Sequence, residues 1–219
     1  MNRKEIFDRD GFVAVQALIT PDQVSELLLD YERVLRGEIP VSEFEGPKRK
    51  GPMIQLANPS QRVPGWQQHP YFLRAREVAS ELLGCEAEYG YDQLIFKPPH
   101  SSSPTAWHQD AGYWRGWKGS LGTERALTCW LALAPAFLEN GCMQFIPGSH
   151  RGEVRAHFSV ADRSEIANAL ATEVDASRAV ACPLRPGDAS FHHCRTLHYT
   201  GGNHTDVPRH ALITHFIAV

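Results

Sequence analysis

The stretch TAWHQDAGYW, residues 105–114, places a histidine and an aspartate two positions apart between aromatic residues. In a β-strand, residues two apart point to the same face, so His108 and Asp110 would direct an imidazole and a carboxylate into one space. Both groups are common metal ligands. The motif is also compatible with a polar strand end at the surface, because His-x-Asp pairs are frequent, and a metal site needs a further ligand.

Histidines crowd the C-terminal part of the chain, and several of them could supply that third ligand. Two histidines and one carboxylate on a single face of an iron ion leave three positions open, the arrangement that non-haem Fe(II) oxygenases use. The same ligands suit zinc in a hydrolytic enzyme, so the residues alone leave both chemistries open. The candidate histidines are His192, His193, His198, His204, His210 and His215.

Composition and charge exclude several classes of protein. The chain has 219 residues, of which 42% are hydrophobic and 21% are charged, as expected for one globular domain with a substantial core. Its net charge of -3 argues against nucleic acid as a partner. We find no signal sequence and no run of about 18 apolar residues, so we expect no membrane partner and a cytoplasmic location. The five cysteines lack CxxC spacing and are expected to be reduced.

The N-terminal third predicts two helices. In TPDQVSELLLDYERVLRG, residues 20–37, Thr20 is placed to cap a helix that starts at Pro21, Gln23 completes a capping box, and Gly37 follows the end. The spacing of apolar residues predicts a second helix over residues 71–83 that ends at Gly84. Residues 38–65, rich in proline, glycine and charge, are expected to form a long irregular loop.

After Gly84 the pattern changes to short apolar or alternating runs separated by proline and glycine, which predict strands. Strands that follow two helices in this way indicate an all-β core with flanking helices (α+β), a sandwich or jelly roll. We expect a single domain over residues 1–219, with N-terminal helices at about 20–84 packed on a jelly-roll core at about 86–219. One short inserted helix is expected within residues 161–174.

Five separated blocks of sequence resemble the phytanoyl-CoA hydroxylase (phytanoyl-CoA dioxygenase) family of Fe(II)- and 2-oxoglutarate-dependent dioxygenases. The blocks are DGFVAV, YDQLIFKPP, WHQDAGYW, ENGCMQFIPGSH and GDASFHHCRTLHYTGGNHTDVPRHA, in this order. The likeness extends from Gly11 to the C-terminus, and it implies a cupin-like double-stranded β-helix. Because the family's distal ligand matches His198, the implied metal ligands are His108, Asp110 and His198. The remaining candidate histidines are then expected to support the strands, to pack or to be exposed.

The resemblance also implies a site for the co-substrate. Arg209 begins the strand after the turn YTGGNHTDVP, and a guanidinium can bind a carboxylate through two parallel hydrogen bonds. The matching arginine of the family holds the far carboxylate of 2-oxoglutarate, assisted by a hydroxyl residue that here is Thr200. Lys97, Gln93 and Trp130 match or neighbour positions near the co-substrate.

The implied activity is hydroxylation of a small molecule with Fe(II), 2-oxoglutarate and O2, which releases succinate and CO2. Asp110 disfavours halogenation, since related halogenases have a small residue there. Desaturation or cyclisation of a secondary metabolite and a catalytically silent metal-binding jelly roll remain alternatives, and either a monomer or a homodimer is expected. The candidate substrate walls are residues 42–61, Tyr113, Trp114, Trp117 and residues 157–178, where Trp114 and Trp117 are equally compatible with the core. Lys48 to Lys50 are expected to lie in a solvated loop, with a cationic rim for an anionic substrate such as an acyl-CoA as the alternative.

Overall fold

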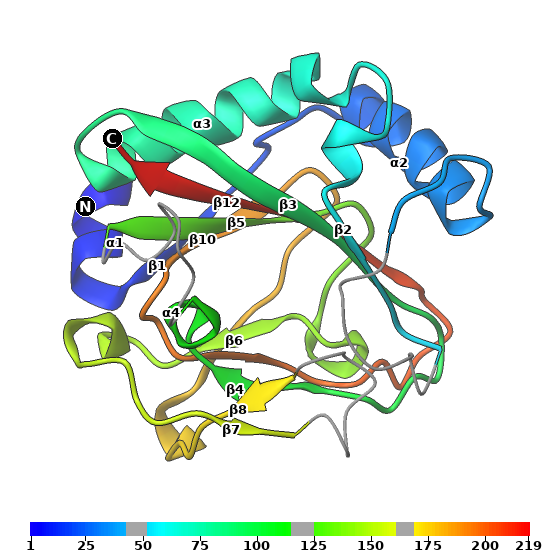
Figure 1. Ribbon diagram of the computed structural model, residues 1–219. Coiled ribbons are helices and arrows are strands. Elements are labelled where there is room, and N and C mark those ends of the chain that lie inside the picture. The colour runs from blue at the N-terminus through cyan, green and yellow to red at the C-terminus, as the bar shows by residue number, and fades with distance from the viewer. Residues whose placement is uncertain (43–51, 115–124, 161–168) are drawn as a thin grey trace.

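The computed structural model of the protein describes residues 1–42, 52–114, 125–160 and 169–219. In these residues two antiparallel sheets pack face to face, and helices cover the outer face of the larger sheet (Figure 1). The larger sheet has the strand order β1-β10-β5-β12-β3-β2, and the smaller sheet has the order β4-β11-β6-β9. The predicted all-β jelly roll with flanking helices is therefore confirmed.

The strands of the larger sheet are β1 (Phe12–Val15), β2 (Ile54–Ala57), β3 (Ala87–Lys97), β5 (Ala126–Ala132), β10 (Ala189–His193) and β12 (Arg209–Ala218). Those of the smaller sheet are β4 (Thr105–His108), β6 (Met143–Phe145), β9 (Val180–Cys182) and β11 (His198–Thr200). A separate pair is formed by β7 (Phe158–Ser159) and β8 (Leu170–Ala171). The α-helices are α1 (Arg3–Asp10), α2 (Pro21–Leu35), α3 (Pro70–Leu83) and α4 (Asp110–Tyr113). Short 3-10 turns span Pro59–Gln61, Trp66–Gln68, Leu138–Asn140, Ser149–Arg151 and Ala176–Arg178.

The two predicted helices are present, and local signals define their ends. Thr20 caps α2 by accepting a hydrogen bond from the Gln23 amide, and the Gln23 side chain returns a bond to the Thr20 amide. Helix α3 ends at Gly84, whose φ of 71° is the left-handed conformation that glycine adopts at low cost. Both helices bury apolar side chains against the larger sheet.

Strand β12 shows how the larger sheet separates two environments. Leu212 and Phe216 face the helices and belong to the main hydrophobic core. Ala211 and Ile213 face the smaller sheet and pack in a second apolar cluster. Since alternate residues share a face, Arg209 and His215 also point between the two sheets. The inner face of this strand therefore combines apolar packing with polar groups.

Four elements differ from the sequence-based expectations. Helix α1 and the edge strands β1 and β2 were not predicted, and β2 lies inside the expected irregular loop of residues 38–65. The expected helix within residues 161–174 is wrong for Leu170–Ala171, which form β8, while residues 161–168 lie outside the described part. The edge strands β1 and β2 form through pairing with distant partners, which local sequence patterns do not encode.

The capping box of α2 predicts a measurable contribution to stability. Thr20→Ala removes the side-chain acceptor for the Gln23 amide, and we expect the free energy of unfolding to fall by about 1 kcal/mol. Urea denaturation followed by circular dichroism measures this change. Ser25→Ala, at an exposed site in the same helix, serves as the control and should change stability by less than about 0.5 kcal/mol. Equal effects of the two substitutions would contradict the capping role.

Candidate metal centre

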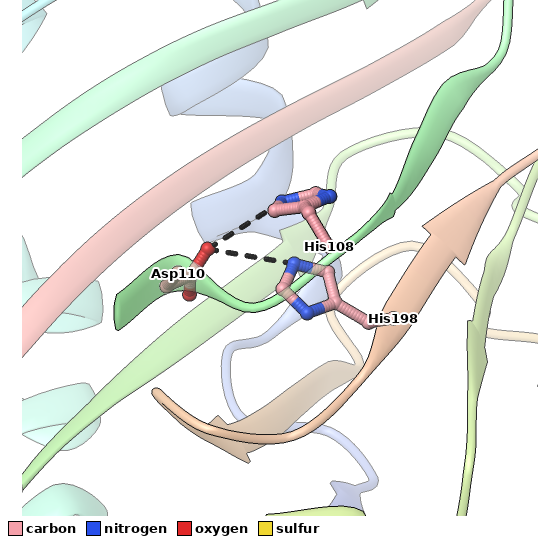
Figure 2. A group of neighbouring side chains, drawn as sticks. All are labelled: His108, Asp110 and His198. Atoms are coloured by element: carbon pink, nitrogen blue, oxygen red, sulfur yellow. Dashed lines mark ion pairs between the residues drawn. The ribbon is translucent and has the colours of Figure 1, made fainter. Parts of the chain in front are cut away.

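Three side chains from two distant parts of the chain meet between the two sheets. Figure 2 shows His108, Asp110 and His198 pointing toward one another. The Asp110 Oδ1 atom lies 3.6 Å from His108 Nε2 and 3.4 Å from His198 Nε2, and all three residues are buried. Atoms bound at about 2.1 Å to one ion in perpendicular directions are about 3 Å apart, so this spacing is close to that of a metal ligand set. In the described part of the chain, no other group of three or more histidine, cysteine or acidic side chains is arranged to hold a metal ion.

The pairing of β4 with β11 brings the two histidines together. His198 is the direct register partner of His108, and their ring centroids are 4.1 Å apart. His198 is the first residue of β11. Asp110 is not part of a strand: it opens α4, but Gln109 before it keeps an extended backbone with φ of -118° and ψ of 135°. This extended residue explains why the two-residue spacing still brings the imidazole and the carboxylate together.

Gln109 lies between His108 and Asp110 in the sequence and ties them to neighbouring segments. Its side chain is buried, donates a hydrogen bond to the Arg195 carbonyl and accepts one from the Arg155 amide. The backbone amide of Ala111 also donates to the Cys194 carbonyl at 3.0 Å. The turn that precedes His198 is therefore fixed directly against the residues that flank Asp110.

The hydrogen bonds of the two histidines orient both rings for metal binding. His108 Nδ1 lies 2.7 Å from the Ala106 carbonyl, and His198 Nδ1 lies 2.9 Å from the Thr196 carbonyl. A carbonyl only accepts hydrogen bonds, so in the neutral rings Nδ1 carries the proton and Nε2 keeps its lone pair. Both Nε2 atoms face Asp110, as metal-binding histidines require. The donor set therefore fits a divalent transition metal ion such as iron.

The charges of the site are strongly perturbed. Burial raises the pKa of the Asp110 carboxyl, but His198, His108 and His192 outweigh this effect and hold that pKa well below its usual value. Burial, together with His198, lowers the pKa of His108 despite the opposing effect of Asp110. The site is therefore a carboxylate beside a neutral imidazole at neutral pH, which is the protonation state that metal binding needs.

Arg209 is a buried cation without an anion in the described part of the chain. Its side chain is 1% exposed, and its Nε and Nη1 atoms have no hydrogen-bond partner there. The guanidinium lies 5.2 Å from the centroid of the Trp130 ring. Burial lowers the pKa of Arg209 to about 10, so the group remains protonated at neutral pH. An unpaired buried charge costs several kcal/mol, so this position favours an anionic ligand such as a carboxylate.

The other predicted co-substrate residues surround the same interior. Lys97 is fully buried, and its Nζ donates hydrogen bonds to Thr200 Oγ1 at 2.8 Å and to the Gly201 carbonyl at 2.6 Å. Lys97 is also the register partner of Arg209. Trp130 is buried under Arg209, so four of the five predicted residues gather near the start of β12.

Gln93 is the fifth, and its contacts differ from those of the other four. Its side chain is half-buried and binds Gln55 and His215 rather than the lysine and arginine. His215 in turn lies 2.9 Å from Thr128, and Thr128 donates to Asp110 Oδ2.

Sequence reasoning assigned no role to Thr128, although one observation about it was accessible. Thr128 lies two residues before Trp130 in the same strand, and so on the same face of the sheet.

The remaining candidate histidines lie in three different environments. His192 is buried, lies 3.2 Å from Asp110 Oδ2, and has its ring centroid 4.4 Å from that of His198. His204 is exposed, and His193 lies at the end of β10. His210 is on the helix side of the sheet and bonds Glu32 at 2.9 Å. His192 and His215 therefore contact the site and are not simple packing residues.

The expected substrate walls are only partly described. The Tyr113 ring meets the His108 ring edge-on with centroids 5.3 Å apart, and its hydroxyl accepts a hydrogen bond from the Leu170 amide. Trp114 is 4% exposed and packs against Tyr91 and His215, so it belongs to the interior. Trp117, Lys48 to Lys50, and large parts of the expected walls at 42–61 and 157–178 lie outside the described residues.

Comparison with known proteins agrees with this geometry. The sequence profile of the family "Phytanoyl-CoA dioxygenase (PhyH)" matches residues 7–211. The probable alpha-ketoglutarate-dependent hypophosphite dioxygenase of Stutzerimonas stutzeri is 26% identical over 234 residues, covering 99% of this chain and 77% of the relative. EvdO2 of Micromonospora carbonacea var. aurantiaca, solved with 2-oxoglutarate, is 33% identical with a TM-score of 0.83 and covers 99% of this chain and 90% of its own. The epimerase SnoN, solved with Fe3+, alpha ketoglutarate and nogalamycin RO, is 28% identical with a TM-score of 0.77 and covers 98% of this chain and 82% of its own.

Fold and donor set define the class of protein, a non-haem oxygenase that depends on Fe(II) and 2-oxoglutarate. The chain belongs to the phytanoyl-CoA dioxygenase family. The predicted enzyme class and cofactors are thereby confirmed. Among the described residues, none of the helices combines the length and apolar character needed to cross a membrane.

Removal of the distal histidine tests the assignment of the metal ligands. His198→Ala deletes one of three proposed ligands, and we expect affinity for Fe(II) or Co(II) to fall by at least about 100-fold and turnover to be lost. Anaerobic titration with Co(II), followed by its visible absorption, measures the affinity. His210→Ala removes a buried histidine on the helix side of the sheet and should leave metal affinity unchanged. A His198→Ala protein that binds metal normally would move the third ligand to another histidine.

Proposed function

We propose that this protein hydroxylates a small-molecule substrate with Fe(II), 2-oxoglutarate and O2, and that it releases succinate and CO2. In this proposal His108, Asp110 and His198 hold the iron. The observation that carries the proposal is the combination of this ligand set with Arg209, a buried guanidinium that has two unpaired nitrogen atoms.

The residues of the chain have distinct roles in the proposed reaction. Arg209 binds the far carboxylate of 2-oxoglutarate, since its planar guanidinium matches two carboxylate oxygens. Thr200 assists through its hydroxyl, which Lys97 orients at 2.8 Å. Trp130 supports the guanidinium from below, and Gln93 lies further along the same face of the sheet. Bound iron supplies the activation of O2, while these residues orient the co-substrate and exclude water.

A dicarboxylate co-substrate explains the buried Arg209 better than a hydrolytic zinc site does. The minimal site of a zinc hydrolase is the three ligands and a water molecule, and it does not by itself account for a buried, unpaired guanidinium. A silent binding protein would also have no reason to retain Arg209 unpaired in its interior, because such a charge lowers stability. Both alternatives therefore leave the most costly residue of the site unexplained.

The second candidate function is a different oxidation at the same metal centre. The similarity to the epimerase SnoN supports this candidate. The iron-ligand set is compatible with hydroxylation, desaturation, cyclisation and epimerisation. The small-molecule product distinguishes them by mass: hydroxylation adds one oxygen atom, desaturation or cyclisation removes two hydrogen atoms, and epimerisation leaves the mass unchanged.

We also propose that residues 1–219 form a single domain, since β1 and β2 pair with β10 and β3 at the two edges of the larger sheet. The five cysteines are unpaired, which supports a reducing compartment such as the cytoplasm. A monomer or a homodimer is our proposal for the oligomeric state.

The co-substrate anchor predicts a selective loss of binding. We expect Arg209→Ala to weaken 2-oxoglutarate binding by at least about 30-fold, because a buried charged hydrogen-bond partner is lost, and to leave Co(II) affinity unchanged. Arg209→Lys should recover only part of the affinity, since lysine keeps the charge but loses the paired geometry. Equilibrium dialysis of 2-oxoglutarate under anaerobic conditions measures both variants. Simultaneous loss of metal and co-substrate would contradict the assigned role.

The reaction itself is tested by reconstitution. We expect anaerobic addition of Fe(II) and 2-oxoglutarate to produce the visible charge-transfer band of the complex, and O2 to yield succinate when a panel of small molecules includes the substrate. Mass spectrometry of the panel should show a product with one additional oxygen atom. A product of unchanged mass or with two hydrogens fewer would replace hydroxylation by the second candidate, and the absence of the band would overturn both.

A further inference from the structure

The proposed ligand Asp110 is held differently at its two oxygen atoms. Its Oδ1 atom faces the two ligand histidines at 3.4 and 3.6 Å. Its Oδ2 atom points to the larger sheet, where it meets the Thr128 hydroxyl at 2.5 Å and His192 Nε2 at 3.2 Å. The carboxylate therefore bridges the ligand side of the site and the opposite sheet.

These contacts follow from one row of cross-strand neighbours on the inner face of the larger sheet. Thr128 in β5 is the register partner of His192 in β10 and of His215 in β12. His215 is in turn opposite Tyr91 in β3, and His192 is opposite Phe12 in β1. Direct neighbours in antiparallel strands have Cβ atoms about 5 Å apart, so this register makes the side-chain contacts unavoidable.

The directions of the hydrogen bonds follow from the chemistry of the groups. An ionised carboxylate only accepts, so the hydrogen of the Thr128 hydroxyl must point to Asp110. A hydroxyl has a single hydrogen, and Thr128 must therefore accept from His215 Nδ1, which lies 2.9 Å away.

The proton on His215 Nδ1 leaves Nε2 of the neutral ring as an acceptor. It receives the Gln93 amide N–H at 2.9 Å, and the Gln93 carbonyl oxygen accepts from Gln55 Nε2 at 2.7 Å.

These hydrogen bonds form a continuous row from Gln55 to Asp110, in which each group donates to the next. All of the donated hydrogens point toward Asp110. The ring of His215 is also fixed sterically, since Tyr91 stacks on it with centroids 4.0 Å apart and Trp114 meets it edge-on at 5.7 Å. A ring held in this way cannot exchange its donor and acceptor atoms by rotation. The row of hydrogen bonds therefore holds a single oxygen atom, Oδ2 of Asp110.

We infer that Thr128 and His192 hold Oδ2 of Asp110 and so make this residue a one-oxygen metal ligand. His215 and Gln93 are positioning residues that act through Thr128. The inference rests on the proposed metal site. It adds which residues determine that only one oxygen of Asp110 faces the ion. Two hydrogen bonds occupy the lone pairs of Oδ2, so binding of the ion by both oxygens would require breaking them. A one-oxygen Asp110 leaves three positions open for the co-substrate and dioxygen.

The test compares metal affinity in variants of the whole chain, with Co(II) as the probe. Thr128→Val keeps the shape of the side chain but removes the hydroxyl, and we expect Co(II) binding to weaken by about 10- to 100-fold, as for other residues that support metal ligands. Thr128→Ser restores the hydroxyl and should remain within about threefold of the wild type. The visible spectrum of bound Co(II) should also change in Thr128→Val, because the coordination of the carboxylate is altered.

Thr214→Val is the matched control. Thr214 is a buried threonine in the adjacent strand β12, but its hydroxyl bonds Tyr71 at 2.8 Å on the helix side of the sheet. This substitution is expected to lower stability while leaving Co(II) affinity and spectrum unchanged. If Thr214→Val weakens metal binding as much as Thr128→Val does, the effect is one of general stability and the inference is wrong.

A double-mutant cycle tests whether His215 acts through Thr128. His215→Phe should weaken Co(II) binding by about 2- to 10-fold in the wild type, the value of one hydrogen bond, and should have no effect in the Thr128→Val background. If the fold losses of Co(II) affinity in His215→Phe and Thr128→Val multiply in the double variant, His215 does not act through Thr128.

A further variant covers the case in which Thr128→Val does not fold. Gln93→Leu, at a half-buried position, then tests the inference. Weaker Co(II) binding supports the proposed row of hydrogen bonds to Asp110, and unchanged binding contradicts it.

Failure of this inference and failure of the proposed function give different results. If the wild-type protein does not bind Co(II), or binds it equally well after His198→Ala, the metal site itself is wrong. If the wild type binds Co(II) and His198→Ala abolishes binding while Thr128→Val has no effect, only the support of Asp110 is wrong.

Discussion

The antiparallel pairing of β4 with β11 is the constraint on which the site depends. It places His108 and His198, ninety positions apart in the sequence, directly opposite each other on the inner face of the smaller sheet. Each imidazole is oriented by a carbonyl two residues earlier in its own segment, so the pairing also determines which nitrogen atoms face inward. A shift of register by one residue would turn His198 to the outer face, where Tyr199 now stacks on Trp107.

The two sheets contribute different parts of the chemistry. The smaller sheet and the residues after β4 supply the three proposed ligands, whereas the larger sheet supplies the groups that surround them: Arg209 at one end and Thr128 with its neighbours nearer the carboxylate. Burial of so many polar groups is unfavourable unless they are paired. The helices on the other face bury the main apolar core, and this packing supplies the stability that a polar interior lacks.

Local patterns made part of this structure predictable. The capping box at Thr20 and the glycine after α3 act over a few residues, so the sequence specifies both helices. The prediction that His108 and Asp110 face the same space also agrees with the structure, although only His108 is in a strand. The third proposed ligand was different, because six histidines were candidates and only the likeness to a family selected His198. For Thr128 the only local signal was its place two residues before Trp130, since its position opposite His192 and His215 exists only after three distant strands have paired. The edge strands β1 and β2 were missed for the same reason.

The identity of the ligands does not determine the outcome of the reaction. Relatives at 26% to 33% identity include a protein named as a hypophosphite dioxygenase and an epimerase, so the reaction varies within this range of similarity. What distinguishes such reactions must lie in how the substrate is held beside the metal. Tyr113 is the described residue best placed to connect the two, because its ring touches His108 and its hydroxyl binds the backbone of β8. Tyr113 therefore links the backbone of β8 to the surroundings of a proposed metal ligand.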